Sequence, residues 1–126
     1  MYNQRMRHTI RGLIIIDKKV LLVTGHGADF YWTPGGGVKA DESHERTLRR
    51  EILEELGVRI VGIVPYATYD YEDQRVENFL IEVDGEMRPS NEITGITWYS
   101  SGSKLKTSGG FKEMALPCLL RDGLID

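Results

Sequence analysis

Residues 36–58 read GGVKADESHERTLRREILEELGV, and the five residues from 33 to 37 read TPGGG. Proline fixes its own φ and glycine loses much backbone entropy on ordering, so residues 33–37 predict a tight loop that neither continues a strand nor starts a helix. Ser43 suits a helix N-cap, and Gly57 can end a helix in the left-handed conformation. We therefore predict a helix over residues 44–56.

One side of this predicted helix collects carboxylates. At about 100° per residue, Glu51, Glu54 and Glu55 fall within an arc of roughly 100°, next to an apolar side. Carboxylates three or four residues apart repel each other, and Mg²⁺ or Mn²⁺ bound by their oxygens would offset that repulsion. An isolated acidic run is usually only a solvated face, but the glycine loop, Glu42 and Arg50 at fixed spacing favour a metal site.

The spacing resembles the Nudix box, Gx5Ex7REUxEExGU, in which U is a bulky aliphatic residue. Every specified position is matched between Gly36 and Val58, with Ile52 and Val58 in the two aliphatic positions. The resemblance implies an α/β fold, a Nudix-type α/β/α sandwich with a mixed β-sheet and a loop-helix-loop catalytic motif. It also implies a metal-dependent hydrolase that cleaves a nucleoside diphosphate linked to another moiety.

The resemblance also implies a role for each residue of the box. Glu51, Glu54 and Glu55 would hold Mg²⁺, or Mn²⁺ as a substitute, and one of them would serve as general base; which one stays open. Arg50 would orient a glutamate, and Glu42 would brace the loop. The carbonyl of Gly35 or Gly36 would add a metal ligand, and Gly57 would end the helix.

Residues outside the box are weaker candidates. The resemblance makes Glu92, which precedes the last predicted strand, a candidate for an additional metal ligand or base. The alternative is a solvated residue, since a single surface glutamate is more often solvated. The odd spacing of Arg5, Arg7 and Arg11 would let them face a phosphate chain from one side of a strand; the alternative is a mobile terminus and an exposed strand residue.

Aromatic residues could supply a stacking surface for a nucleobase. Phe30, Tyr31, Tyr69 and Tyr71 are the candidates, and half-buried strand or loop positions are the alternative. His26 could gate the site or assist a leaving group, or be a plain loop residue; His44 should lie near the acidic face. Cys118 is most simply a buried apolar residue.

Composition sets the remaining expectations. The 126 residues predict a single domain, and 40% hydrophobic with 28% charged residues is typical of a soluble globular protein. A net charge of −3 disfavours a nucleic-acid polymer as partner, except an RNA 5′ end. No apolar run is long enough for a membrane span, and the one cysteine fits a reducing compartment, so we expect a cytoplasmic protein. The resemblance also makes a homodimer an expectation.

The rest of the chain reads mainly as strands. We predict a hairpin of strands 8–16 and 20–23 around a turn at 17–19, strands at 58–64 and 66–71, a turn at 72–75, and strands at 76–83 and 96–99. Residues 100–110 read as a mobile linker, and residues 111–120 as a final helix that Pro117 kinks or splits.

Substrate choice is only partly predicted. The leading hypothesis is a nucleoside triphosphate that gives a monophosphate and pyrophosphate. Dinucleoside polyphosphates, nucleotide sugars and capped RNA are alternatives, as is a module that senses nucleotides without turnover. Many relatives carry arginines where Thr24 and Gly25 follow Val23 here, so phosphate contacts must come from elsewhere. MutT-like enzymes for oxidised guanine often use an Asn or Asp near the last helix, and residues 111–120 offer none.

Overall fold

The strands and helices are described by a computed structural model over residues 6–126, so Arg5 lies outside the described residues. In chain order the elements are β1 (Arg7–Leu13), β2 (Ile15–Ile16), β3 (Lys19–Gly25), β4 (Gly35–Gly37), α1 (His44–Leu56), β5 (Arg59–Tyr71), β6 (Gln74–Asp84), β7 (Ile93–Tyr99), the π-helical turn η1 (Phe111–Ala115) and α2 (Leu116–Arg121). Within that range no helix has the length and apolar character needed to cross a membrane.

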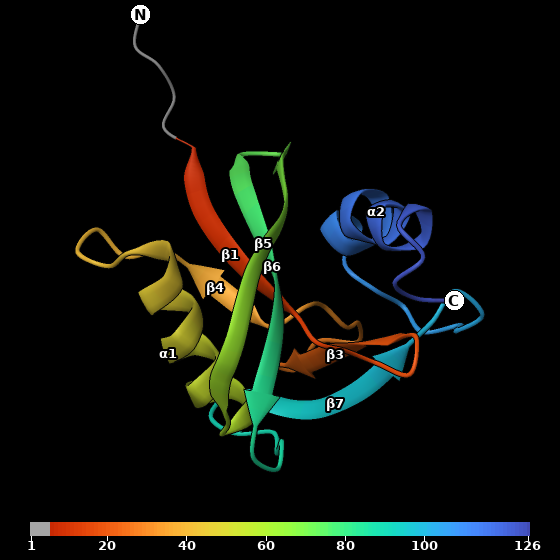
Figure 1. Ribbon diagram of the computed structural model, residues 1–126, viewed down its shortest axis with the longest axis horizontal. Helices are drawn as coiled ribbons and strands as arrows, with labels where there is room; N and C mark the ends of the chain where they lie inside the picture. The colour runs from red at the N-terminus through yellow and green to blue at the C-terminus, as the bar shows by residue number, and fades with distance from the viewer. Residues whose placement is uncertain (1–5) are drawn as a thin grey trace, which may run out of the picture.

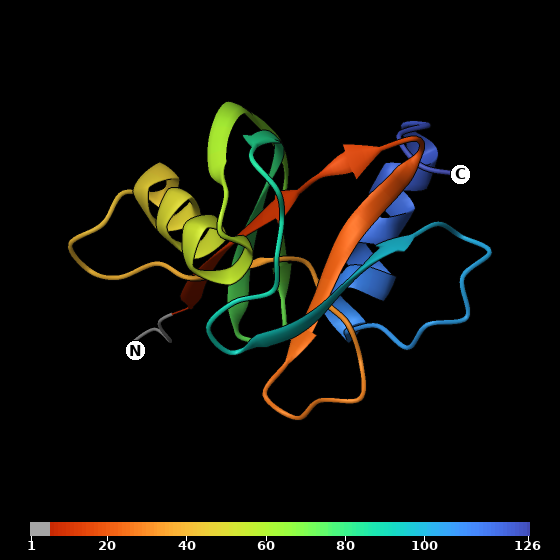
Figure 2. The ribbon, with the colours of Figure 1, turned by 90° about the horizontal axis from the view of Figure 1, so that it is seen from below.

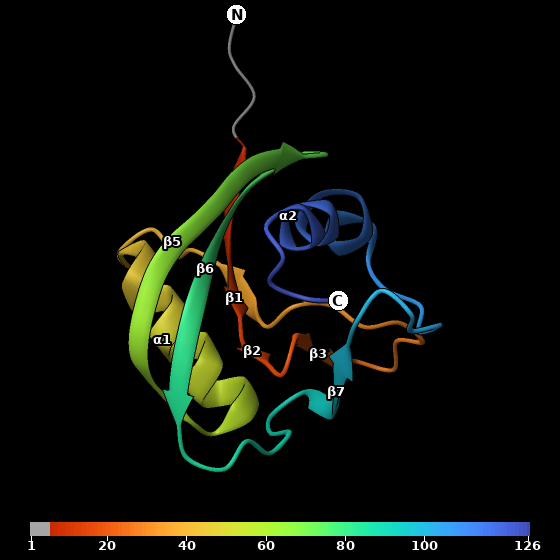
Figure 3. The ribbon, with the colours of Figure 1, turned by 45° about the vertical axis from the view of Figure 1, so that its right-hand side comes forward.

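The strands form two sheets between helices. A four-stranded sheet has the order β4-β1-β6-β5, and a three-stranded sheet has the order β2-β3-β7. The first is mixed, because β1 runs parallel to β6 while the β1–β4 and β5–β6 pairs are antiparallel. Helix α1 lies on one side of the four-stranded sheet, and η1 with α2 lies on the other (Figures 1 and 3). The predicted α/β sandwich is therefore confirmed.

Two hydrophobic cores follow from this layering, and Figure 2 shows the helices that cover them at opposite ends of the molecule. The α1 core joins the apolar side of α1 to both sheets and contains Ile10, Ile14, Leu21, Val23, Leu48, Ile52, Leu56, Val58, Ile60, Ile81 and Ile93. The α2 core contains Leu13, Val20, Leu22, Tyr99, Phe111, Ala115, Leu119 and Ile125. Strand β3 contributes alternate residues to the two cores, as expected for side chains that alternate between faces.

The caps of α1 explain why its limits were predictable. The Ser43 side chain accepts a hydrogen bond from the backbone N–H of Arg46, and Gly57 adopts φ 71° while donating to Leu53 O. Both caps satisfy backbone groups that a helix end leaves without partners. The predicted helix, residues 44–56, coincides with α1.

Several strand predictions were wrong, and each has a physical reason. The strand predicted over residues 8–16 divides at Ile14, where the chain leaves one sheet for the other. The predicted break at Pro65 does not occur, because β5 is an edge strand where a missing N–H is tolerated and a register shift absorbs the proline. Strand β7 starts three residues earlier than predicted, since its pairing with β3 reaches Gly25.

The turns and the linker also differ from the prediction. The hairpin turns are shorter than predicted, because Ile16 already pairs with Lys19 and Tyr71 with Gln74. The predicted linker 100–110 is held at Tyr31, whose backbone N–H donates to Lys106 O and whose carbonyl accepts from Ser108 N–H. Pro117 does split the last helical segment, since it lies in the first turn of α2, directly after η1.

Candidate functional site

The glycine run lies on an edge strand instead of the predicted loop. Gly35–Gly37 form β4, which pairs with residues 9–11 of β1. Backbone pairing needs no side chain, and here a side chain would be excluded: a Cβ on Gly35 would lie 2.0 Å from Ile10 O, at φ 143°. A Cβ on Gly36 would lie 2.0 Å from Glu51 Oε2. The glycines therefore allow α1 to bring its carboxylates against the strand.

Two glutamates of α1 reach the glycine strand. The backbone N–H of Gly35 donates to Glu55 Oε1 at 3.3 Å, and the carboxylate of Glu51 lies against Gly36. Burial raises the pKa of Glu51. Burial, with the negative charge of Glu51 beside it, raises the pKa of Glu55 to about 8. These are two neighbouring, partly buried carboxylates whose repulsion a cation would offset.

Glu54 lies differently from its two neighbours. Its side chain is 43% exposed and accepts from Arg50 Nη1 at 3.3 Å. Across residues 6–126, no three His, Cys, Asp or Glu side chains converge as a metal-binding group. The structure thus brings Glu51 and Glu55 together at β4, and it turns Glu54 toward Arg50.

Arg50 and Glu42 form the best-defined ion pair of the site. The Arg50 Nε and Nη2 atoms donate to the two oxygens of Glu42 at 2.8 and 3.0 Å, and Thr47 Oγ1 donates to Glu42 Oε1 at 2.9 Å. The hydrogen bonds from Arg50 lower the pKa of Glu42 to about 2, and the same bonds raise the pKa of Arg50. Arg50 Nη1 is also 3.9 Å from Glu51 Oε2. One guanidinium therefore joins the loop before α1 to the glutamates of the helix.

The oxygen donors at β4 fit a hard divalent cation. Carboxylates of Glu51 and Glu55, with Glu54 one turn away, are the kind of ligand that Mg²⁺ takes while keeping several waters and binding phosphate oxygens. The fit rests on this donor set: two carboxylates that α1 holds side by side, both with pKa values that burial raises.

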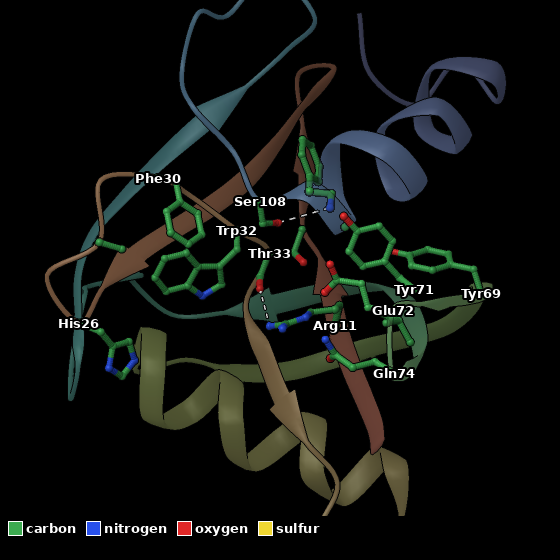
Figure 4. Close-up of a pocket in the computed structure, with 15 residues that line it drawn as sticks. Arg11, His26, Phe30, Trp32, Thr33, Tyr69, Tyr71, Glu72, Gln74 and Ser108 are labelled. Atoms are coloured by element: carbon green, nitrogen blue, oxygen red, sulfur yellow. Dashed lines mark hydrogen bonds between the residues drawn. The ribbon is translucent and has the colours of Figure 1, made fainter. Parts of the chain in front are cut away.

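A pocket of about 570 Å³ opens on the other side of β1 from α1 (Figure 4). Aromatic side chains supply much of its wall, and the polar residues come from distant parts of the chain. Its lining consists of Arg11, His26, Ala28, Phe30, Trp32, Thr33, Tyr69, Tyr71, Glu72, Gln74, Val76, Ser108, Gly109, Gly110 and Phe111. The volume suits a small organic molecule.

Most of the aromatic residues predicted from the sequence lie at this pocket. Phe30, Tyr69 and Tyr71 line it, as does His26. Tyr31 does not, because its backbone pairs with Thr107 and its side chain packs against the α2 core. Sequence reasoning missed Gln74 and Ser108 as lining residues. No local pattern marks them, since only the folded sheet and the segment before η1 bring them to the pocket that Arg11 lines.

Other candidates lie apart from the glutamates of α1. Glu92 is 70% exposed and pairs with His26 Nδ1 at 3.0 Å. His44 contacts Glu77 of β6 through Nδ1 instead of the acidic face of α1. Arg7 is 69% exposed and pairs with Asp73, whereas Arg11 lines the pocket. Cys118 is only half-buried, not buried as predicted.

Comparisons with known proteins agree with this arrangement. The model of the NUDIX domain family matches residues 6–106. An 8-oxo-dGTP diphosphatase from Buchnera aphidicola subsp. Acyrthosiphon pisum (strain APS) is 32% identical over 89 residues, which cover 68% of this chain and 71% of the relative.

Solved structures share the fold at lower identity. A MutT NUDIX hydrolase from Burkholderia pseudomallei superposes with a TM-score of 0.81 at 23% identity, covering 92% of this chain and 99% of that one. An ADP-ribose pyrophosphatase from Streptococcus suis superposes with a TM-score of 0.71 at 20% identity, covering 92% and 91%. With the family model matching most of its length, this chain belongs to the Nudix hydrolase family.

Proposed function

We propose that this protein is a Mg²⁺-dependent pyrophosphohydrolase that cleaves a nucleoside triphosphate to a nucleoside monophosphate and pyrophosphate. One observation carries the proposal: α1 holds Glu51 and Glu55 against the glycine strand β4, and a pocket with aromatic walls opens on the other side of β1. The carboxylates suit the metal-bound phosphates, and the pocket suits the nucleoside.

The residues of the box would have different roles in this reaction. Glu51 and Glu55, with Glu54 beside them, would hold Mg²⁺, and the ion would neutralise phosphate charge and activate water. Arg50 keeps the helix and the preceding loop in fixed relation through Glu42, so the carboxylates keep their positions when the substrate arrives. A glutamate that is not occupied by metal accepts the proton from the attacking water, and the choice among the three stays open.

The name of the relative supports a nucleoside triphosphate as the substrate class. That relative is an 8-oxo-dGTP diphosphatase. The last helical segment of this chain offers no Asn or Asp at residues 111–120, so oxidised guanine nucleotides belong in the test without being the expected favourite.

The test is product release from a panel of substrates in Mg²⁺. The panel contains the common nucleoside triphosphates, 8-oxo-dGTP, ADP-ribose, a nucleotide sugar and a dinucleoside tetraphosphate. We expect pyrophosphate and a monophosphate from the triphosphates. Glu51→Gln and Glu55→Gln should each lower kcat by about 100-fold or more while the far-UV spectrum stays unchanged.

Glu54→Gln separates the roles of the three glutamates. Because Glu54 is more exposed and bound to Arg50, its removal tests whether the third carboxylate takes part in turnover at all. If the wild-type protein binds Mg²⁺ and nucleotide but releases no product from any member of the panel, the hydrolase proposal falls and a nucleotide-sensing module replaces it.

A further inference from the structure

Arg11 lies at the floor of the pocket because of its position in β1. Its neighbour Ile10 enters the α1 core, so Arg11 projects from the opposite face of the strand, into the pocket. Figure 4 shows its guanidinium between Trp32 on one side and Tyr69 and Tyr71 on the other. A planar ring held by these aromatic side chains would present its edge to Arg11.

The Arg11 guanidinium has more N–H donors than it uses within residues 6–126. Nη1 donates to Thr33 O at 3.0 Å, and within residues 6–126 Arg11 makes no ion pair, whereas Arg50 and Arg75 each pair with a carboxylate. A guanidinium has five N–H donors, and burial lowers the pKa of Arg11. A desolvated cation in this position is stabilised when a ligand supplies an acceptor.

A second donor faces the same pocket. Gln74 lines it, and Gln74 Oε1 already accepts a hydrogen bond from Thr9 Oγ1 at 2.7 Å, which leaves the amide nitrogen to donate. The two donor groups, on Arg11 and Gln74, favour a ligand whose edge carries hydrogen-bond acceptors. The aromatic walls favour a planar ring in the pocket instead of a phosphate group. The phosphate chain of the same ligand would then extend to the carboxylates of α1.

We propose that Arg11 determines base specificity by binding a carbonyl oxygen on the edge of the base, so that the pocket favours bases with a carbonyl over their amino counterparts. This inference rests on the proposed function, since it assigns a base to the pocket of a nucleotide hydrolase. Hypoxanthine and adenine form the sharpest comparison, because position 6 carries a carbonyl in one and an amino group in the other. Arginine pairs with the O6 and N7 acceptors of such a purine.

The first measurement uses the wild-type protein. Calorimetry without metal compares inosine with adenosine, which have no phosphate, and kinetics in Mg²⁺ compare ITP with ATP. A well-formed bidentate contact predicts a preference of about 5- to 150-fold for inosine and for ITP. Equal affinity for the two nucleosides overturns the proposal, whatever the variants do.

The variants assign the preference to Arg11. Arg11→Met should bring the inosine-to-adenosine affinity ratio close to one, mainly by weakening inosine, and Arg11→Lys should leave an intermediate ratio while keeping the positive charge. Arg75→Met is the matched control, because Arg75 is an exposed arginine on a neighbouring strand and pairs with Asp70. The control should keep the wild-type ratio.

Further outcomes separate this inference from the function on which it rests. Equal losses for ITP and ATP, with nucleoside binding unchanged, would mean a phosphate contact and overturn the proposal. If wild type and Arg11→Met hydrolyse ITP and ATP with the same ratio of rates, the inference about Arg11 is overturned and the hydrolase proposal stands. An Arg11-dependent preference for inosine without any turnover would support it and overturn the hydrolase. No binding and no turnover would overturn both.

Discussion

At the scale of a single residue, Gly36 leaves no room for a side chain in the candidate site. A methyl group there would meet Glu51 Oε2 at 2.0 Å, so Gly36→Ala must displace the Glu51 carboxylate. We expect kcat to fall at least tenfold with only a small change in melting temperature, because the displaced group is the end of a side chain. Gly102→Ala is the control, since its added Cβ meets nothing within 4 Å. Equal activity in the two variants would contradict the proposed role of Glu51.

The Glu42–Arg50 ion pair makes a prediction about pH at the same scale. The folded-state pKa of Glu42 is about 2, below its ordinary value of 4.5, so the charged form stabilises the fold. That stabilisation is complete above about pH 5 and is lost as pH falls toward 2. Urea unfolding of Glu42→Gln and wild type at several pH values should therefore show a smaller acid-induced loss in the variant. Parallel curves would refute the assignment.

The N-cap of α1 can be tested at the scale of the element. Ser43 accepts a hydrogen bond from Arg46 N–H at 3.1 Å, and Ser43→Ala removes that acceptor. The free energy of unfolding should fall by about 1 kcal/mol. Ser101→Ala, at an exposed serine outside the helices, should change it by less than about 0.5 kcal/mol, and a similar loss in both would show that the cap contributes little.

The same helix shows which elements a sequence can predict. Residues 44–56 are bounded by Ser43 and Gly57, local signals that act within a few residues, and the prediction matched α1. Strand β4 was missed because Gly35–Gly37 have no strand propensity, and they pair only because β1 lies beside them. The break predicted at Pro65 failed for a related reason: whether a strand tolerates proline depends on its place at a sheet edge, which the local sequence does not state.

The candidate site likewise has a part that the sequence predicts and a part that only the fold reveals. Glu42, Arg50, Glu51 and Glu55 meet because they share one loop and one helix, and their spacing anticipates this. The pocket is lined by Arg11, Gln74 and Ser108, which are far apart in sequence, so only the completed fold reveals the set.

At the scale of the whole molecule, Mg²⁺ binding should raise the free energy of unfolding. Because a ligand that binds only the folded state stabilises it, Mg²⁺ at about 100 times its Kd would add about 2.7 kcal/mol. We expect the melting temperature to rise on titration of the EDTA-treated protein with Mg²⁺, and to rise less for Glu51→Gln combined with Glu55→Gln. The same rise in wild type and double variant would place the cation elsewhere.

Strand β3 has a consequence for how the molecule opens. Val20 and Leu22 belong to the α2 core, Leu21 and Val23 belong to the α1 core, and all four side chains are fully buried. Neither helix can therefore be lost without exposing one face of the same strand, so the two halves should unfold together. In native-state hydrogen exchange, the amides of residues 20–23 should be among the slowest to exchange and should report the global free energy of unfolding. Rapid exchange there, with α1 still protected, would show that the halves separate.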